Sequence, residues 1–201
     1  MGKSNEYNGG LTREQFLFYE IRIVAKLILE GEDRDSIIKK LKDENLFQFP
    51  TERMISSIAN TCFKRIDALE SDSLVEELAN GSMEVAKQIN LYAMMRYNRV
   101  VWDFMVTVIG EKFRTQDFGF SQSDLNLFFL RLQEQNDQVA SWSDATVNKI
   151  KQVLKKSLVE CCFIDSVRAD KLNAVYPYDE LIEGIKENGD FDALAAFNYF
   201  S

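Results

Sequence analysis

Residues 51–69, TERMISSIANTCFKRIDAL, are the stretch that decides the fold of this chain. Its apolar residues recur every three or four positions, which places them on one side of a helix. That side comprises Met54, Ile55, Ile58, Ala59, Cys62, Ile66 and Leu69. The stretch therefore predicts an amphipathic helix that packs against a helical core.

The opposite side of the same helix carries a polar stripe. Arg53, Ser57, Asn60 and Lys64 follow one another at i, i+4, i+7 and i+11. Two cations, a hydroxyl and an amide are groups that contact phosphates and base edges. An ordinary solvated helix face offers the same groups, so the stripe alone leaves both interpretations open.

Two further helices are predicted before this one. Thr12 and Gln15 have the spacing of a capping box that opens a first helix, and Gly31 ends it. A short helix from Asp33 or Asp35 to about Lys42 follows, and then an irregular link of about seven residues. DNA-binding helix-turn-helix motifs use three or four residues there, so we expect a helix-turn-helix-like element rather than a close copy.

One charged residue of the first helix lies among its apolar positions. Glu20 falls between the two apolar rows, where an unpaired carboxylate would be costly to bury. Arg65 lies on the apolar edge of the 51–69 helix, which predicts a buried ion pair between Glu20 and Arg65. Arg96 and Arg99 are the other candidate partners, and pairing with Asp103 or other buried acids is the favoured interpretation of both.

The rest of the chain also predicts helices. With 2 Pro and 9 Gly in 201 residues, long helices are favoured over a turn-rich sheet. We expect an all-α fold of two packed helical subdomains, preceded by a flexible N-terminal lead. The predicted boundaries are 1–10 for the lead, 11–80 for the N-terminal subdomain and 81–201 for the C-terminal subdomain, with helices over about 71–79, 82–95, 99–114, 121–132, 144–162, 179–187 and 190–199.

The helix over 144–162 repeats the arrangement of the first. Its apolar stripe lies opposite a face with several lysines, and a shorter helix precedes it. The second candidate nucleic-acid surface therefore comprises Lys149, Gln152, Lys155 and Lys156. A lysine face is also the ordinary form of a solvated helix, so this surface has the same two interpretations as the first.

The charge distribution favours neither interpretation outright. The net charge of −8 argues against nucleic acid as a partner. Residues 39–66, however, hold six cations and three anions, whereas residues 67–84 hold six anions and no cation. Residues 143–171 are basic again and residues 172–201 acidic. A fold that gathers the basic segments would create a local positive patch despite the acidic total.

Several classes of function are disfavoured by what the sequence lacks. There is no histidine, which removes Ser-His and Cys-His nucleophile pairs and the most common zinc ligand. Glycine-rich phosphate loops and membrane-length apolar runs are also missing. We expect a cytoplasmic protein without catalysis, cofactor, metal or small-molecule substrate. A carboxylate-metal nuclease using Glu20, Glu76, Glu77 and Asp103 is the enzymatic alternative.

The order of these features resembles the BrxA family, small all-helical proteins of BREX phage-defence systems. The resemblance is carried by residues along nearly the whole chain: Leu11-Thr12, Glu20-x-Arg22 with Val24-Ala25, Asn45-Leu46-Phe47, Arg65-Ile66-x-x-Leu69, Ala86-Lys87-Gln88, the tract from Arg96 to Phe104, and Trp142-Ser143-x-x-Thr146 with Leu154 and Leu158. Cys161-Cys162 departs from the ending that is usual in the family, and the net charge is more acidic than expected of a dedicated DNA binder.

The resemblance implies a NusB-like helical bundle and double-stranded DNA binding. It also implies a role beside a BREX methyltransferase and other BREX proteins, with no catalysis of its own. Two hypotheses follow. The chain is either a DNA-binding accessory protein that contacts phosphates, or a protein-protein scaffold whose acidic segments, residues 67–84 and 172–201, attract larger BREX components.

Overall fold

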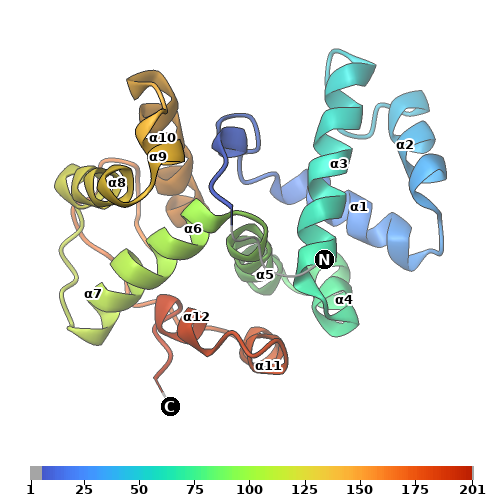
Figure 1. Ribbon diagram of the computed structural model, residues 1–201. Helices are drawn as coiled ribbons and strands as arrows, with labels where there is room; N and C mark the ends of the chain where they lie inside the picture. The colour runs from blue at the N-terminus through green and yellow to red at the C-terminus, as the bar shows by residue number, and fades with distance from the viewer. Residues whose placement is uncertain (1–5, 201) are drawn as a thin grey trace.

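The computed structural model describes residues 6–200, whose regular secondary structure is helical (Figure 1). The expected all-α class is thus confirmed, whereas the likeness to NusB stays a prediction. The elements are the 3₁₀ helix η1 (Gly9–Thr12), α1 (Phe18–Leu29), α2 (Arg34–Asp43), α3 (Glu52–Leu69), α4 (Asp72–Asn80), α5 (Met83–Tyr97), α6 (Arg99–Phe104), the π-helix η2 (Met105–Gly110), α7 (Glu111–Arg114), α8 (Gln122–Gln135), α9 (Asp137–Ala140), α10 (Asp144–Glu160), α11 (Asp179–Glu187) and α12 (Phe191–Ala196).

Most of these helices begin where a short polar side chain caps them. Thr51 accepts a hydrogen bond from the main-chain N–H of Met54 at the start of α3, and Ser143 accepts one from Thr146 at the start of α10. The same role is taken by Asp33, Ser71, Ser82 and Ser121 at α2, α4, α5 and α8. The predicted starts of these helices are confirmed.

The start of the first helix differs from the prediction. Thr12 ends the 3₁₀ turn, where its hydroxyl donates to the carbonyl of Gly9, and α1 begins only at Phe18. Leu17, just before α1, has a left-handed backbone with φ of 52°. The capping box of Thr12 and Gln15 is therefore wrong, because residues 13–17 form an irregular segment in which the carbonyls of residues 14–16 accept hydrogen bonds from Arg65 of α3.

A continuous helical rod formed by α6, η2 and α7 spans residues 99–114. The sequence predicted a single apolar helix here and gave no sign of the π-helical turn in its middle. At the end of that turn Gly110 lies directly against α12, so that a β-carbon at Gly110 would be 3.2 Å from the main-chain nitrogen of Ala196. A glycine at this position lets the C-terminal helix approach closely.

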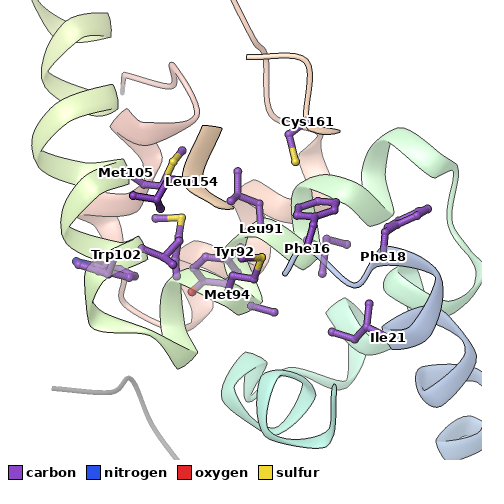
Figure 2. Packing of buried hydrophobic residues seen from close by; sticks show 14 of the residues in the cluster. Phe16, Phe18, Ile21, Leu91, Tyr92, Met94, Trp102, Met105, Leu154 and Cys161 are labelled. Atoms are coloured by element: carbon purple, nitrogen blue, oxygen red, sulfur yellow. The ribbon is translucent and has the colours of Figure 1, made fainter. Parts of the chain in front are cut away.

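Helix α5 lies at the centre of the molecule and joins its two halves. In Figure 2, Leu91, Tyr92 and Met94 of α5 lie between two groups of side chains. On one side are Trp102, Met105 and Leu154 of the C-terminal half, and on the other are Phe16, Phe18 and Ile21 of the N-terminal half. One hydrophobic cluster thus runs through both predicted subdomains, and the boundary at residue 80 stays a prediction.

The predicted N-terminal lead, residues 1–10, falls partly outside the described residues. Within residues 6–10 the chain contacts the C-terminal half. The hydroxyl of Tyr7 donates to Asp103 at 2.6 Å, and Asn8 both caps η1 and accepts from Asn98. This part of the lead is therefore attached to the start of α6.

The two helix-turn-helix-like elements differ in their connections. Eight residues, 44–51, link α2 to α3, and two of them, Asn45 and Gln48, have left-handed backbones. Between α8 and α10 the link contains the short helix α9. Nowhere in residues 6–200 is there a helix long and apolar enough to cross a membrane.

Candidate nucleic-acid interface

The polar stripe of α3 lies on the surface as the helical pattern predicted. Arg53, Ser57, Asn60 and Lys64 are all exposed, whereas Ile55, Ala59 and Cys62 on the other side are buried. Neither cation of the stripe has a carboxylate within 4 Å anywhere in residues 6–200. Both positive charges are thus available to an external anion.

The corresponding face of α10 is also open to solvent. Gln152 and Lys156 are exposed, and Lys149 and Lys155 are half-buried. The ammonium group of Lys155 donates a hydrogen bond to the carbonyl oxygen of Val167 at 3.4 Å. Because this carbonyl is neutral, the positive charge of Lys155 still has no counter-ion. None of the three lysines has a carboxylate within 4 Å in the described part of the chain.

Many cations elsewhere are neutralised by nearby acids. Lys112, for example, lies 2.9 Å from Asp124 and 3.0 Å from Asp117, and this pairing raises the pKa of Lys112 although partial burial opposes the shift. The other ion-paired cations are Arg34, Lys40, Lys87, Arg96, Arg99 and Arg114. The cations of the candidate stripes differ from these seven in having no acidic partner, a property that they share with other described cations such as Lys171 and Lys186.

A hollow of about 550 Å³ lies between α3 and α10. Met54 and Ile58 line it from α3, and Val153 and Lys156 line it from α10. Figure 1 shows the two helices on either side of the chain segment that connects η1 to α1. The structure thus brings the two basic helices to the walls of one concavity, but of the eight candidate residues only Lys156 lines it.

Two lining residues of this hollow were not singled out from the sequence. Arg13 is exposed and carries a second unpaired positive charge beside that of Lys156. Tyr19, at the N-terminal end of α1, also lines the hollow; it is 69% exposed and meets Phe18 edge-on. Tyr19 falls outside the two apolar rows of the first helix. This position was the one indication in the sequence that its ring is exposed.

The predicted buried ion pair between Glu20 and Arg65 is not formed. Arg65 is buried as expected, with 1% of its surface exposed, but its guanidinium donates to the main-chain carbonyls of Glu14, Gln15 and Phe16. Glu20 is half-buried and lines the hollow instead. Burial lowers the pKa of Arg65, and nearby acids including Glu14 and Glu20 act in the opposite direction. The pairing was wrong because the irregular segment before α1 supplies the acceptors.

Arg96 and Arg99 pair with acids, as favoured from the sequence. Arg99 lies 2.9 Å from Asp103. Arg96 is buried and contacts both Glu70 and Asp190 at 2.6 Å, and it also donates to the carbonyl of Ala68. Arg96 is committed to the interior and the half-buried Arg99 is neutralised by Asp103, so neither cation lies in the candidate interface.

The two acidic segments also lie together. Helix α11 packs on α4, and Gly184 of α11 is so close to the side chain of Leu74 that a β-carbon would be 2.5 Å from it. The exposed carboxylates of this acidic face are Asp72, Glu76, Glu84, Asp179, Glu180, Glu183, Glu187 and Asp192. Figure 1 shows α4 and α11 at the lower side of the molecule and α10 at the upper side.

The four carboxylates proposed for a metal nuclease do not gather. Glu20 lies on α1, Glu76 and Glu77 lie on α4, and Asp103 is held by Arg99 and Tyr7. In residues 6–200 there is no group of three or more cysteine or acidic side chains that could hold a metal ion.

Comparison with known proteins places this arrangement in a family. The family model described as BrxA matches residues 5–189, which is nearly the whole chain. The chain belongs to the BrxA family. The resemblance noted from the sequence is thus confirmed, and with it membership of a family of BREX proteins.

Curated relatives of the BrxA chain cover most of its length. It is 31% identical over 191 residues to the BREX protein BrxA of Bacillus cereus (strain H3081.97), with 94% of this chain and 95% of the relative covered. It is 25% identical over 187 residues to the BREX protein BrxA of Escherichia coli O9:H4 (strain HS), with 93% and 87% covered.

A solved structure supports the fold. The crystal structure of an uncharacterized protein from Magnetospirillum magneticum is similar to this one with a TM-score of 0.79 at 22% identity, and the match covers 95% of this chain and 97% of that one. The likeness concerns the fold alone.

Proposed function

We propose that this BrxA chain is a non-enzymatic component of a BREX phage-defence system that binds double-stranded DNA through the phosphates. The positive groups of α3 and α10 would contact the backbone of the duplex, with Ser57, Asn60 and Gln152 as additional hydrogen-bonding groups. Such contacts position a protein on DNA with little sequence preference. The chain would act in the cytoplasm beside other BREX proteins.

One observation carries the proposal. Arg53, Lys64, Lys149, Lys155 and Lys156 have no acidic partner in the described part of the chain, and a hollow lined by Lys156 lies between their two helices. A net charge of −8 opposes association with DNA at long range. Counter-ions released from phosphates by five unpaired cations would still supply binding free energy at short range.

The proposal is tested by measuring affinity for a duplex of fixed sequence over a range of salt concentrations. The wild-type chain should bind with an affinity that falls steeply as salt rises. The double variants Arg53→Glu with Lys64→Glu, and Lys149→Glu with Lys156→Glu, should each lower the affinity and reduce the slope of log K against log salt by about 2, because each removes two phosphate contacts.

A matched control separates local contacts from total charge. Lys171→Glu with Lys186→Glu changes the net charge by the same amount at exposed lysines outside both helices. It should leave the salt slope unchanged. Equal losses in all three double variants would show that only net charge matters, and the proposed interface would be abandoned.

A second candidate function, a protein-protein scaffold, is favoured by the packing of α11 on α4. This packing joins the acidic segments 67–84 and 172–201 into one face, which would attract basic surfaces of larger BREX components. Reversing Glu76, Glu180 and Glu183 to lysine should then abolish co-purification of a BREX partner while duplex binding persists. A partner lost on nuclease treatment would instead be held through DNA.

A further inference from the structure

The hollow between α3 and α10 is apolar in its interior, which phosphate binding does not require. Its exposed apolar side chains are Tyr19, Met54 and Val167, with exposed fractions of 69%, 44% and 45%. Phe49, Ile58 and Val159 add half-buried apolar surface beside them. An apolar patch rimmed by charged groups usually marks a binding site.

The charges around the patch indicate what it binds. Unpaired Arg13 and Lys156 line the hollow, and Lys155 lies at its edge beside Val167. Two carboxylate residues, Glu20 and Glu160, line it as well, and Glu160 is paired with Lys87 at 3.2 Å. Arg13 and Lys156 therefore offer an occupant two unpaired positive charges. Nucleic acid combines phosphates with flat apolar rings, and an exposed aromatic ring in a basic surround is the usual platform for an unstacked base.

Glu20 further restricts the ligands that the hollow can bind. Glu20 lines the hollow, and its carboxylate accepts no hydrogen bond from the described residues. A free carboxylate repels phosphate and acidic peptides, but it accepts a hydrogen bond from the exocyclic amino group of cytosine, and the amino group of adenine is a similar donor. The hollow thus offers a ring for stacking and an acceptor for an amino group, with cations outside.

We propose that the hollow receives one unpaired, amino-bearing base of a distorted duplex, with Tyr19 as the stacking residue and Glu20 as the hydrogen-bond acceptor. This inference rests on the proposed DNA binding and goes beyond it. In an intact duplex both faces of each base are covered by its neighbours, so only a base outside the stack can lie against Tyr19. The chain would then prefer DNA with a bulged or flipped base.

The experiment compares three duplexes in the full chain: one perfect, one with a single bulged cytosine and one with a single bulged thymine. The wild type should bind the cytosine bulge about 5- to 150-fold more tightly than the perfect duplex. Tyr19→Ala should remove this preference, so that bulged and perfect duplexes bind with equal affinity, whereas Tyr19→Phe should retain the preference. Glu20→Ala should abolish discrimination between bulged cytosine and bulged thymine.

A control variant and three contrary outcomes make the inference testable. Tyr176→Ala removes a tyrosine that is 72% exposed outside this hollow, and it should change nothing. Equal wild-type affinity for bulged and perfect duplexes overturns the inference but not the proposed function. Equal weakening on all three duplexes in Tyr19→Ala also overturns it. Failure of the wild type to bind any of them overturns both.

Discussion

The guanidinium of Arg65 on α3 lies 3.1 Å from the carbonyl oxygen of Phe16, 49 residues earlier in the chain. It also donates to the carbonyls of Glu14 and Gln15, each at 2.8 Å. Asn90 of α5 donates to the same Phe16 oxygen at 2.7 Å. Two interior helices thus hold the irregular segment before α1 in place.

Replacing Arg65 should therefore destabilise the whole fold. Arg65→Met leaves the part-buried carbonyl oxygens of Glu14 and Gln15 without this donor, whereas that of Phe16 keeps Asn90. Each orphaned group costs roughly 1–3 kcal/mol, so we expect the free energy of unfolding to fall by about 2–6 kcal/mol, measured by urea denaturation. Lys64→Met, the exposed neighbour, is the matched control and should change stability by less than about 0.5 kcal/mol.

Glu20→Gln discriminates between the observed arrangement and the ion pair expected from the sequence. Since Glu20 does not contact Arg65 in the structure, its replacement should have little effect on unfolding. A loss as large as that of Arg65→Met would mean that the two charges are paired after all.

Arg96 provides a second test of buried charge. It contacts Asp190, whose side chain is only 11% exposed, and Glu70. Arg96→Leu strands the Asp190 carboxylate in a buried site, which typically costs about 3–5 kcal/mol. Thermal unfolding should show the loss. Arg34→Leu breaks an exposed pair with Asp67 and should cost no more than about 1 kcal/mol.

The junction of the acidic segments depends on the absence of a side chain at Gly184. In Gly184→Ala the new methyl group would overlap Leu74, which is itself buried with 1% exposed. Such overpacking costs about 1–3 kcal/mol, and faster amide hydrogen exchange in α11 should accompany it. Glu183→Ala, on the exposed side of the same helix, should leave exchange unchanged. Equal exchange in both variants would contradict the close packing.

The three cysteines should differ sharply in reactivity. Cys62 and Cys161 are buried, and Cys162 is exposed. Burial raises the pKa of Cys62 from 9.0 to about 12, so its thiolate remains scarce at pH 8. A thiol reagent should modify one cysteine in the native chain and three in denaturant, and Cys162→Ser should abolish the native reaction.

The same pKa shift has a consequence for alkaline stability. Because the thiol of Cys62 holds its proton more tightly in the folded state, its contribution to stability is complete below pH 9 and is lost between pH 9 and about 12. Cys62→Ala should flatten the pH dependence of unfolding in that window, relative to Cys162→Ser.

Local signals in the sequence predicted much of the fold. The predicted helix starts near residues 51, 82 and 144 agree with α3, α5 and α10, where Thr51, Ser82 and Ser143 act as caps, because a cap and the apolar stripe after it are encoded within a few residues. The exposure of the α3 stripe followed from helical period alone. These features depend on neighbours in the chain and need no tertiary information.

What the sequence could not predict depends on distant contacts. Thr12 and Gln15 have capping-box spacing, yet the carbonyls of residues 14–16 accept hydrogen bonds from Arg65. Because these carbonyls are bonded to a distant side chain, α1 begins later. The π-turn at 105–110 has no local signature and coincides with the approach of α12 to Gly110. Tyr19 and Arg13 became candidate site residues only when α3 and α10 were seen to enclose one hollow.

The acidic face of α4 and α11 lies away from the basic helix α10. Separated charges of opposite sign give the molecule an electric dipole, which a polyanion in solution senses before any contact. The torque would turn the lysines toward the polyanion and the carboxylates away from it while the chain is still diffusing. A protein with a negative net charge would then reach its partner already oriented, and fewer collisions would involve the acidic face of α4 and α11.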